Sequence, residues 1–341
     1  MPAGETISFA AGSNAAAAWH ASEMRARTSN VLHLTPSDLE EIDVAMRHLA
    51  RARLRSAQIG RGTFRLEHLA ETLRQITLEL ESGCGYYLIR GLPVARYSVD
   101  EVAMMLCGMG SHLGRVMPQD SAGRLIHHVR AEGAASHADR IVRGDRLGDA
   151  LPFHSDSCDI AALLCVGAAD MGGLSALASS YAVHDALAAE DPDALAVLYR
   201  PFHIDRHGDH DAVLPPYYST PVFMRHNGRL FSRFNPGYVY SAQRYRETPR
   251  LTAHQVDAMD AFHRMCASPR FRFDVELIPG DLQLLNNNTT VHARSAYRDG
   301  AERQRHLLRA WLFTSQIEDI PPPMRDRFRD MENWRSNLDA D

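Results

Sequence analysis

The segment Leu151-Pro152-Phe153-His154-Ser155-Asp156 places an imidazole and a carboxylate two residues apart on a stretch that the sequence predicts to be extended. Side chains at positions i and i+2 of an extended chain point to the same side, so His154 and Asp156 share a face. A facial site for non-haem iron(II) needs a second imidazole and leaves adjacent positions open for substrate chemistry. The tripeptide alone is weak, because most of the chain's 18 histidines will have ordinary structural roles.

A second imidazole is available in Asn288-Thr289-Thr290-Val291-His292-Ala293-Arg294. The residues before it, from Phe271 to Leu285 with a turn at Gly280-Asp281, predict a β-hairpin. Such a hairpin would present His292 from a rigid sheet. The candidate metal ligands are therefore His154, Asp156 and His292.

Further along, Arg305-His306-Leu307-Leu308-Arg309-Ala310-Trp311-Leu312 is predicted as a strand. A period of two places Arg305 and Arg309 on one face, beside two large apolar side chains. A guanidinium group presents a fixed fork of donors that suits carboxylates, and burying it without an anionic partner is costly. The strand therefore predicts an anionic ligand. Arg303 has the same parity as Arg305 and is a rival for the first position.

Composition excludes several other classes of protein. The 341 residues are 45% hydrophobic and 23% charged, as in ordinary globular proteins, which rules out collagen, coiled coil and disorder. The net charge of −5 gives no global electrostatic footprint for nucleic acid. All 37 basic residues are arginine, so Schiff-base lysine chemistry and a phosphate-loop lysine are excluded.

Cysteine usage and hydropathy indicate the compartment. The five cysteines form no C-x-x-C pair, which argues against a disulfide framework and a structural zinc site and fits a reducing cytoplasm. No stretch approaches 18 consecutive apolar residues, and no secretory signal is visible. We therefore expect a cytoplasmic protein with a small-molecule substrate and without nucleic acid or membrane partners. The sequence leaves the oligomeric state open, including a homo-oligomer.

Along the chain, three stretches differ in composition. The sequence predicts a loosely ordered arm over residues 1–30 and a single domain over residues 31–320. It predicts a polar tail over residues 321–341, a stretch that begins with three prolines. Within the domain, a helical layer over about residues 35–114 precedes a β core over about 80–315. Helices are predicted near residues 39–55, 67–81, 99–113, 183–198 and 255–267, and a strand near 85–91. The stretch 131–150 is predicted to be a long surface loop of the kind that often acts as a lid.

In this order, H-x-D, a distal histidine and an Arg-x-x-x-Arg strand resemble the iron(II)- and 2-oxoglutarate-dependent dioxygenases of the taurine dioxygenase (TauD/TfdA) and clavaminate synthase-like superfamily. The segment Gly85 to Pro93 is similar to the family's early strand and turn. Gly172-Gly173-Leu174-Ser175 is similar to its glycine pair before a cosubstrate-binding hydroxyl, and Gly280 to His292 to its distal-histidine hairpin. The resemblance covers about residues 80–315.

The resemblance implies a mainly β fold with helical outworks and a double-stranded β-helix, or jelly-roll, core. The iron ligands that it implies are His154, Asp156 and His292. Arg305 would bind the distal carboxylate of 2-oxoglutarate with help from Ser175, which stands where the family often has Thr. Arg309 would lie near the chelating end or an anionic group of the substrate. Because related halogenases lack the metal carboxylate, Asp156 favours hydroxylation or desaturation over halogenation.

The resemblance also implies an activity. An enzyme of this family would use iron(II), 2-oxoglutarate and O2 to hydroxylate or desaturate a small polar or anionic metabolite, such as an amino acid or a secondary-metabolism intermediate, with release of succinate and CO2. Two alternatives would use the same residues. A metal-dependent hydrolase or lyase would place water at the open position, although the Arg-x-x-x-Arg strand and the Gly-Gly-Leu-Ser turn count against it. A non-catalytic jelly-roll binding module or sensor would bind its ligand without turnover.

Weaker candidates for substrate contact are spread over several segments. Asp159 closely follows the metal carboxylate and would face a substrate amine, although a turn or cap role explains it equally well. The other candidates are Phe153 beside the first ligand, Gln119 and His127 before the predicted lid, and Arg225 and Arg233 around the Asn227-Gly228 turn. Ordinary structural roles are common for all of these residue types.

Overall fold

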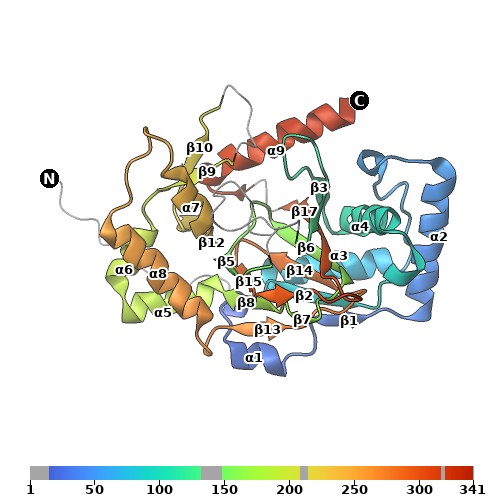
Figure 1. The fold of residues 1–341 in the computed structure, drawn as a ribbon, viewed down its shortest axis with the longest axis horizontal. Coiled ribbons are helices and arrows are strands. Elements are labelled where there is room, and N and C mark those ends of the chain that lie inside the picture. The colour runs from blue at the N-terminus through green and yellow to red at the C-terminus, as the bar shows by residue number, and fades with distance from the viewer. Residues whose placement is uncertain (1–14, 132–147, 208–213, 316–318, 341) are drawn as a thin grey trace.

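The computed structural model describes residues 15–131, 148–207, 214–315 and 319–340. Two β-sheets face each other in the middle of the molecule, and helices lie on their outer sides (Figure 1). Most of the predicted lid over 131–150 lies outside the described residues. In the described part, no helix is long and apolar enough to cross a membrane.

The larger sheet has seven strands and is antiparallel except where β1 runs parallel to β2. Its strands are, in spatial order, β1 (Val31–His33), β2 (Tyr86–Arg90), β14 (Leu282–Asn286), β6 (Ile160–Gly167), β17 (His306–Phe313) and β3 (Arg115–Met117), with β4 (Ile126–Val129) also paired to β17. The strand predicted near 85–91 is confirmed as β2. The arginine-containing strand is β17, with Arg305 immediately before its first residue.

The alternation predicted for β17 is confirmed. Leu308 and Leu312 pack in the core that lies under the N-terminal helices, whereas Leu307 and Trp311 pack on the other side of the sheet. A register irregularity between His306 and Leu307 interrupts the pairing with β6. The two faces of β17 therefore contact different layers, as a period of two requires.

The smaller sheet is antiparallel and carries two of the predicted ligands. Its strands, in spatial order, are β13 (Phe273–Val275), β8 (Ser175–Ser179), β15 (Thr290–Arg294) and β5 (Leu151–His154). Leu177 of β8 packs in one buried cluster with Leu163 and Leu307 of the larger sheet, so the inner faces share a core. Three two-stranded ribbons pair β9 (Phe202–Asp205) with β10 (Tyr217–Thr220), β11 (Phe223–His226) with β12 (Arg229–Ser232), and β7 (Met171–Gly172) with β16 (Tyr297–Arg298).

Helices cover the outer faces of both sheets (Figure 1). The larger sheet is covered by α2 (Pro36–Ala52), α3 (Leu69–Ser82) and α4 (Val99–Leu113), and the smaller one by α5 (Ser180–Glu190), α6 (Pro192–Leu198) and α8 (Ala253–Ala267). The short helices are α1 (Ala21–Ala26), α7 (Pro236–Ala242) and the 3-10 turns Ala15–Ala17, Ser56–Gln58 and Val94–Arg96. Helix α2 begins with a capping box, in which the Thr35 hydroxyl accepts from the Asp38 N–H and the Asp38 carboxylate accepts from the Thr35 N–H.

The single helix predicted over 183–198 is wrong, because the chain forms two helices there. Asp191 ends α5, and its carboxylate accepts a hydrogen bond from the Ala194 N–H at 3.0 Å. Pro192 opens α6. Proline has no N–H to continue the preceding helix, but it fits the first turn of the next one.

The predicted hairpin from Phe271 to Leu285 is also wrong. Its two halves, β13 and β14, belong to different sheets, because the chain crosses between them at Gly280. The Gly280 N–H donates to the Cys165 carbonyl and its own carbonyl accepts from the Leu92 N–H, which fixes the entry into the larger sheet. In the same way, β14 and β15 lie in different sheets, so His292 is not presented by a hairpin.

The described residues near both ends are more regular than predicted, and residues 1–14 of the predicted arm lie outside the described residues. Helix α9 (Pro322–Ala340) replaces the predicted polar tail, and Met324, Phe328 and Met331 bury one stripe of it. The prolines do not end regular structure there, because proline is tolerated in the first turn of a helix. Residues 15–30 are not a loose arm either, since Trp19 is buried and its indole N–H donates to the Cys84 carbonyl at 2.8 Å.

Candidate metal centre

His154, Asp156 and His292 converge between the two sheets. His292 on β15 lies directly opposite His154 at the end of β5, and their ring centroids are 4.3 Å apart. One potential ligand atom from each of the three residues lies within 4.8 Å of the others. The structure therefore brings together the three residues that the sequence singled out, at a spacing that could hold one metal ion.

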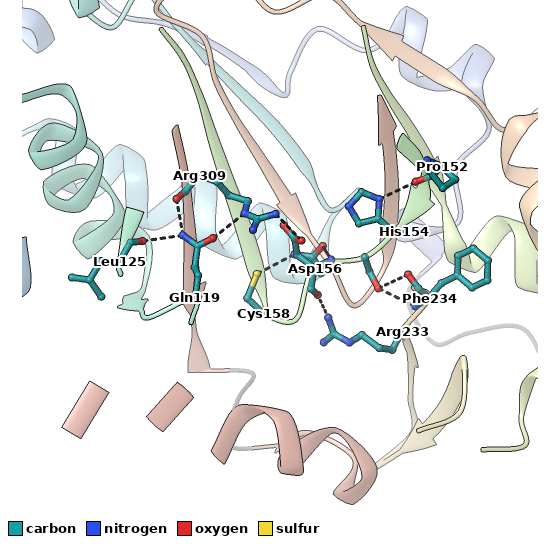
Figure 2. Close-up of polar contacts among 11 residues, drawn as sticks. Gln119, Leu125, Pro152, His154, Asp156, Cys158, Arg233, Phe234 and Arg309 are labelled. Atoms are coloured by element: carbon teal, nitrogen blue, oxygen red, sulfur yellow. Dashed lines mark hydrogen bonds and ion pairs between the residues drawn. The ribbon is translucent and has the colours of Figure 1, made fainter. Parts of the chain in front are cut away.

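The chain segment from Ser155 to Asp156 is fixed by hydrogen bonds to the backbone and side chains of neighbouring segments (Figure 2). The Ser155 N–H donates to the Phe234 carbonyl at 2.6 Å, and the Ser155 hydroxyl accepts from the Phe234 N–H at 2.9 Å. The Asp156 N–H donates to Asn287 Oδ1 at 2.9 Å, and Arg233 donates to the Asp156 carbonyl. These bonds fix the segment that follows β5 and, with it, the position of Asp156.

Both imidazoles are suited to metal binding. His154 Nδ1 lies 2.9 Å from the Pro152 carbonyl, an arrangement in which Nδ1 carries the proton and Nε2 is the ligating nitrogen. Burial, together with the neighbouring His154, lowers the pKa of His292 to about 3. The His292 ring is therefore neutral near neutral pH, which is the form that binds a metal.

Asp156 has one paired and one unpaired oxygen. Burial alone would raise the pKa of this carboxyl, but Arg309 and the two imidazoles reverse that effect, so the pKa is lowered. Oδ1 lies 3.1 Å from Arg309 Nη1, whereas Oδ2 is buried without a hydrogen-bond partner in the described part of the chain. A buried anionic oxygen of this kind needs a positive partner, and a divalent cation between the ligands supplies one.

Gln119 and Arg309 form a closed hydrogen-bond unit beside Asp156 (Figure 2). The Arg309 Nε donates to Gln119 Oε1 at 2.9 Å, and the Gln119 amide donates to the carbonyls of Arg309 and Leu125 at 2.7 and 3.0 Å. The Arg309 guanidinium also lies 5.0 Å from the Trp311 ring. Gln119, predicted as a substrate contact, thus holds Arg309 in place. His127, another such candidate, lies opposite Arg309 on β4.

Arg305 differs from Arg309, because no anion of the described chain pairs with it. It is buried, and its Nη1 has no hydrogen-bond partner among the described residues. Burial and the nearby Arg294 lower the pKa of Arg305 to about 10. Its rival Arg303 is exposed. An unpaired buried guanidinium fits the carboxylate end of an anionic cosubstrate.

The glycine pair predicted near the cosubstrate makes room for Arg305. Gly172 and Gly173 have φ of 77° and 74°, a backbone conformation that favours glycine. A Cβ at Gly173 would lie 3.0 Å from both Cδ and Nε of Arg305. Ser175, which follows on β8, is buried and has the same parity as Leu177, the residue paired with His292. Ser175 thus lies on the strand face that carries the candidate metal ligand.

The remaining predicted substrate residues lie elsewhere. Phe153 packs in the core under α5 and α8, on the opposite side of β5 from His154. Asp159 accepts from the Thr314 N–H at 3.0 Å and from the Asn288 amide at 3.3 Å, so its carboxylate binds within the fold. Arg225 is exposed on its hairpin. Arg233, the other candidate substrate contact near this turn, is buried and donates to the Asp156 carbonyl.

Three residues near the candidate site were missed from the sequence. Arg294 lies two residues after His292 on β15, so the rule that placed Arg305 and Arg309 on one face could have found it. Tyr297 contacts both Arg294 and Arg305, and Asn287 binds the Asp156 N–H. No local pattern marks either residue, because both act through contacts that the fold creates.

Residues 47–311 match the family model "Taurine catabolism dioxygenase TauD, TfdA family". The chain belongs to this family, and it is a non-haem iron(II)- and 2-oxoglutarate-dependent dioxygenase that uses O2. The enzyme class is therefore an oxygenase, and neither a hydrolase or lyase nor a non-catalytic sensor.

Individual relatives are similar over most of the chain. FR-33289 synthase of Streptomyces rubellomurinus is 32% identical over 263 residues, which are 75% of this chain and 77% of that protein. The taurine hydroxylase-like protein SAT17 of Stachybotrys chartarum is 27% identical over 323 residues, which are 90% and 81% of the two chains. The structure of an asparagine oxygenase with iron(II), 2S,3S-3-hydroxyasparagine and succinate covers 84% of this chain and 94% of its own, with a TM-score of 0.66 and 17% identity. It has the same fold.

Proposed function

We propose that this oxygenase hydroxylates or desaturates a small polar or anionic metabolite, such as an amino acid or an intermediate of secondary metabolism, and releases succinate and CO2. The proposed iron ligands are His154, Asp156 and His292. The observation that carries the assignment is the convergence of these side chains within 4.8 Å around an unpaired Asp156 oxygen. When bound, iron and 2-oxoglutarate supply the oxidising chemistry with O2.

The finer description of the fold is part of this proposal. We infer that the two facing sheets form a double-stranded β-helix. The inference is supported by strands that follow one another in sequence but lie in opposite sheets, as β13, β14 and β15 do. It is also supported by the core that the inner faces share. A rigid two-sheet frame would keep ligands from β5 and β15 in register.

The residues of the chain have separate proposed tasks. Arg305, with the Ser175 hydroxyl, binds the distal carboxylate of 2-oxoglutarate and orients it. Arg309 keeps Asp156 ionised and lies beside the position of the chelating end. The three proposed ligands are at most 9% exposed, and the low dielectric of a buried site strengthens each of these electrostatic contacts.

The substrate class is supported by the names of the similar proteins and by the charges near Asp156. Asparagine oxygenase and a taurine hydroxylase-like protein are named for small molecules that carry charged or amide groups. In this chain, the buried Arg309 guanidinium binds the Asp156 carboxylate, and the buried Arg233 guanidinium donates to the Asp156 backbone carbonyl. Two buried cations close to Asp156 favour an approaching anionic or polar group.

A screen for succinate formation tests the proposal. Iron(II)-loaded protein is incubated with 2-oxoglutarate, O2 and candidate amino acids or sulfonates, and succinate is measured together with the oxidised product. The wild type should form both in equal amounts with its true substrate, whereas His154→Ala should form neither. His48→Ala, an exposed histidine on α2, is the matched control and should retain activity. Equal succinate formation by His154→Ala and the wild type would contradict the proposed site.

A further inference from the structure

Tyr297 lies against two buried guanidinium groups. The guanidinium carbons of Arg294 and Arg305 are 4.9 and 5.1 Å from the centroid of its ring. The face of an aromatic ring is negative and attracts cations at this distance. The Tyr297 ring is therefore an electrostatic contact of Arg305, whose guanidinium has no anionic partner in the described chain.

The backbone of Tyr297 is fixed at this position. Its N–H donates to the Gly148 carbonyl at 2.9 Å, and the residue pairs with Gly172 between β16 and β7. A Cβ at Gly173 would lie 3.4 Å from Tyr297 Cβ and 3.0 Å from Arg305 Cδ, so the glycine pair, the ring and the guanidinium pack against one another. The ring is therefore part of the wall that holds Arg305.

Tyr297 and Arg305, which are in contact, each have a buried donor without a hydrogen-bond partner in the described part of the chain. The Tyr297 hydroxyl and Arg305 Nη1 are both buried and have no hydrogen-bond partner among the residues that the structure describes. Leaving buried donors unsatisfied costs free energy, and an anionic oxygen is the acceptor that compensates a guanidinium best. One carboxylate, with two oxygens, could accept from both groups.

We propose that Tyr297 is a further cosubstrate-binding residue, whose ring orients Arg305 and whose hydroxyl donates a hydrogen bond to the distal carboxylate of 2-oxoglutarate. The inference rests on the proposed function, because it requires that Arg305 binds this carboxylate. Arg294 lies on the same ring and adds positive charge at this end of the site. Two guanidinium groups, rather than the Arg305 guanidinium alone, thus contact the Tyr297 ring at this end of the proposed site.

Tyr297→Phe tests the hydroxyl, because it removes one oxygen and keeps the ring. Binding of 2-oxoglutarate to Mn(II)-loaded protein is measured by isothermal titration calorimetry, so no turnover is involved. We expect about tenfold weaker binding, the size of one lost hydrogen bond to a charged group. Oxalate, which chelates the metal but has no distal carboxylate, should bind the variant and the wild type equally. Unchanged 2-oxoglutarate binding, or an equal loss for oxalate, would overturn the proposal.

Two further variants separate this proposal from the function on which it rests. Tyr297→Leu also removes the ring and should weaken 2-oxoglutarate binding further than Tyr297→Phe does. Arg305→Gln should weaken it most. If Arg305→Gln binds 2-oxoglutarate like the wild type, the cosubstrate assignment itself fails. If Arg305→Gln is impaired and Tyr297→Phe is not, only the role of the tyrosine hydroxyl fails.

Discussion

Arg309 on β17 and Arg305 just before it are both buried, yet only one of them meets an anion of its own chain. Arg309 Nη1 lies 3.1 Å from Asp156 Oδ1, and its Nε donates to Gln119. Arg305 lies on the Tyr297 ring with an unpaired Nη1 in the described chain. Because a buried guanidinium needs a negative partner, we assign Arg309 to the framework of the proposed metal site and propose Arg305 as the residue that binds an external anion.

The largest effect is expected for Arg309→Gln. Removing this cation leaves the Asp156 carboxylate buried and unpaired in the metal-free protein, which should lower the free energy of unfolding by about 3–5 kcal/mol. Urea unfolding of the metal-free protein measures it. The matched variant Arg305→Gln removes a cation without such a partner and should lower stability little or raise it. Equal destabilisation by the two variants would remove the distinction between the two arginines.

For 2-oxoglutarate binding, the order of the two arginines should be reversed, with the larger effect at Arg305. Arg305→Gln should weaken binding by at least about 100-fold, because it removes one partner of a buried charge pair. Calorimetric titration of the Mn(II)-loaded protein gives the dissociation constant. Arg303 is exposed and lies two residues before Arg305, so Arg303→Gln is the control. This variant should bind 2-oxoglutarate like the wild type. A strong loss in Arg303→Gln with an intact Arg305→Gln would reverse the assignment.

Asp159 extends the comparison to carboxylates. Unlike Asp156, it has no paired guanidinium in the described chain, and burial raises its pKa to about 6 despite hydrogen bonds from Thr314 and Asn288. The folded state therefore holds this proton more tightly than the unfolded state. The resulting stabilisation is complete below about pH 4 and is lost as the pH rises through about 6, on the order of 2–3 kcal/mol in all.

Asp159→Asn should remove this pH dependence. Unfolding free energies measured from pH 4 to pH 7 should fall less steeply in the variant than in the wild type. Parallel curves for the two proteins would mean that the carboxyl titrates normally.

The smallest effect is expected for Gln119→Leu. The side chain supports Arg309 through its Oε1, so its loss should cost about 1–2 kcal/mol of stability without removing a charge. Thermal unfolding measures this loss, and 2-oxoglutarate binding should change less than in Arg305→Gln. A loss as large as that of Arg309→Gln would mean that Gln119 itself, rather than the ion pair, holds the site.

The predictable parts of the site are those that follow from the alternation of side chains along an extended chain. It placed His154 with Asp156, and it separated the two faces of β17 correctly. The same rule puts Phe153 on the opposite side of β5 from His154. The prediction of Phe153 as a substrate contact therefore contradicted this alternation. Arg294, two residues after His292, was open to the same argument.

The rest depends on contacts between distant segments. Strand and turn signals do not say which sheet a strand joins, so Phe271 to Leu285 resembled a hairpin although its halves lie in different sheets. The prolines at the start of α9 were interpreted as the end of regular structure, although they open a helix whose buried stripe packs on residues far away in sequence. Gln119 contacts Arg309, which is far away in sequence. Tyr297 contacts Arg305, which lies immediately before a different strand. No local sequence pattern encodes either contact.

Anaerobic difference spectroscopy tests the central claim most directly, namely that one site holds iron through His154, Asp156 and His292 and 2-oxoglutarate through Arg305. Iron(II) and 2-oxoglutarate are added to metal-free protein, and the weak visible charge-transfer band of the chelate is recorded. We predict the band in the wild type, its absence in Asp156→Ala, and a much higher 2-oxoglutarate requirement in Arg305→Gln. Iron binding without the band in the wild type, or an unchanged band in Asp156→Ala, would contradict the account.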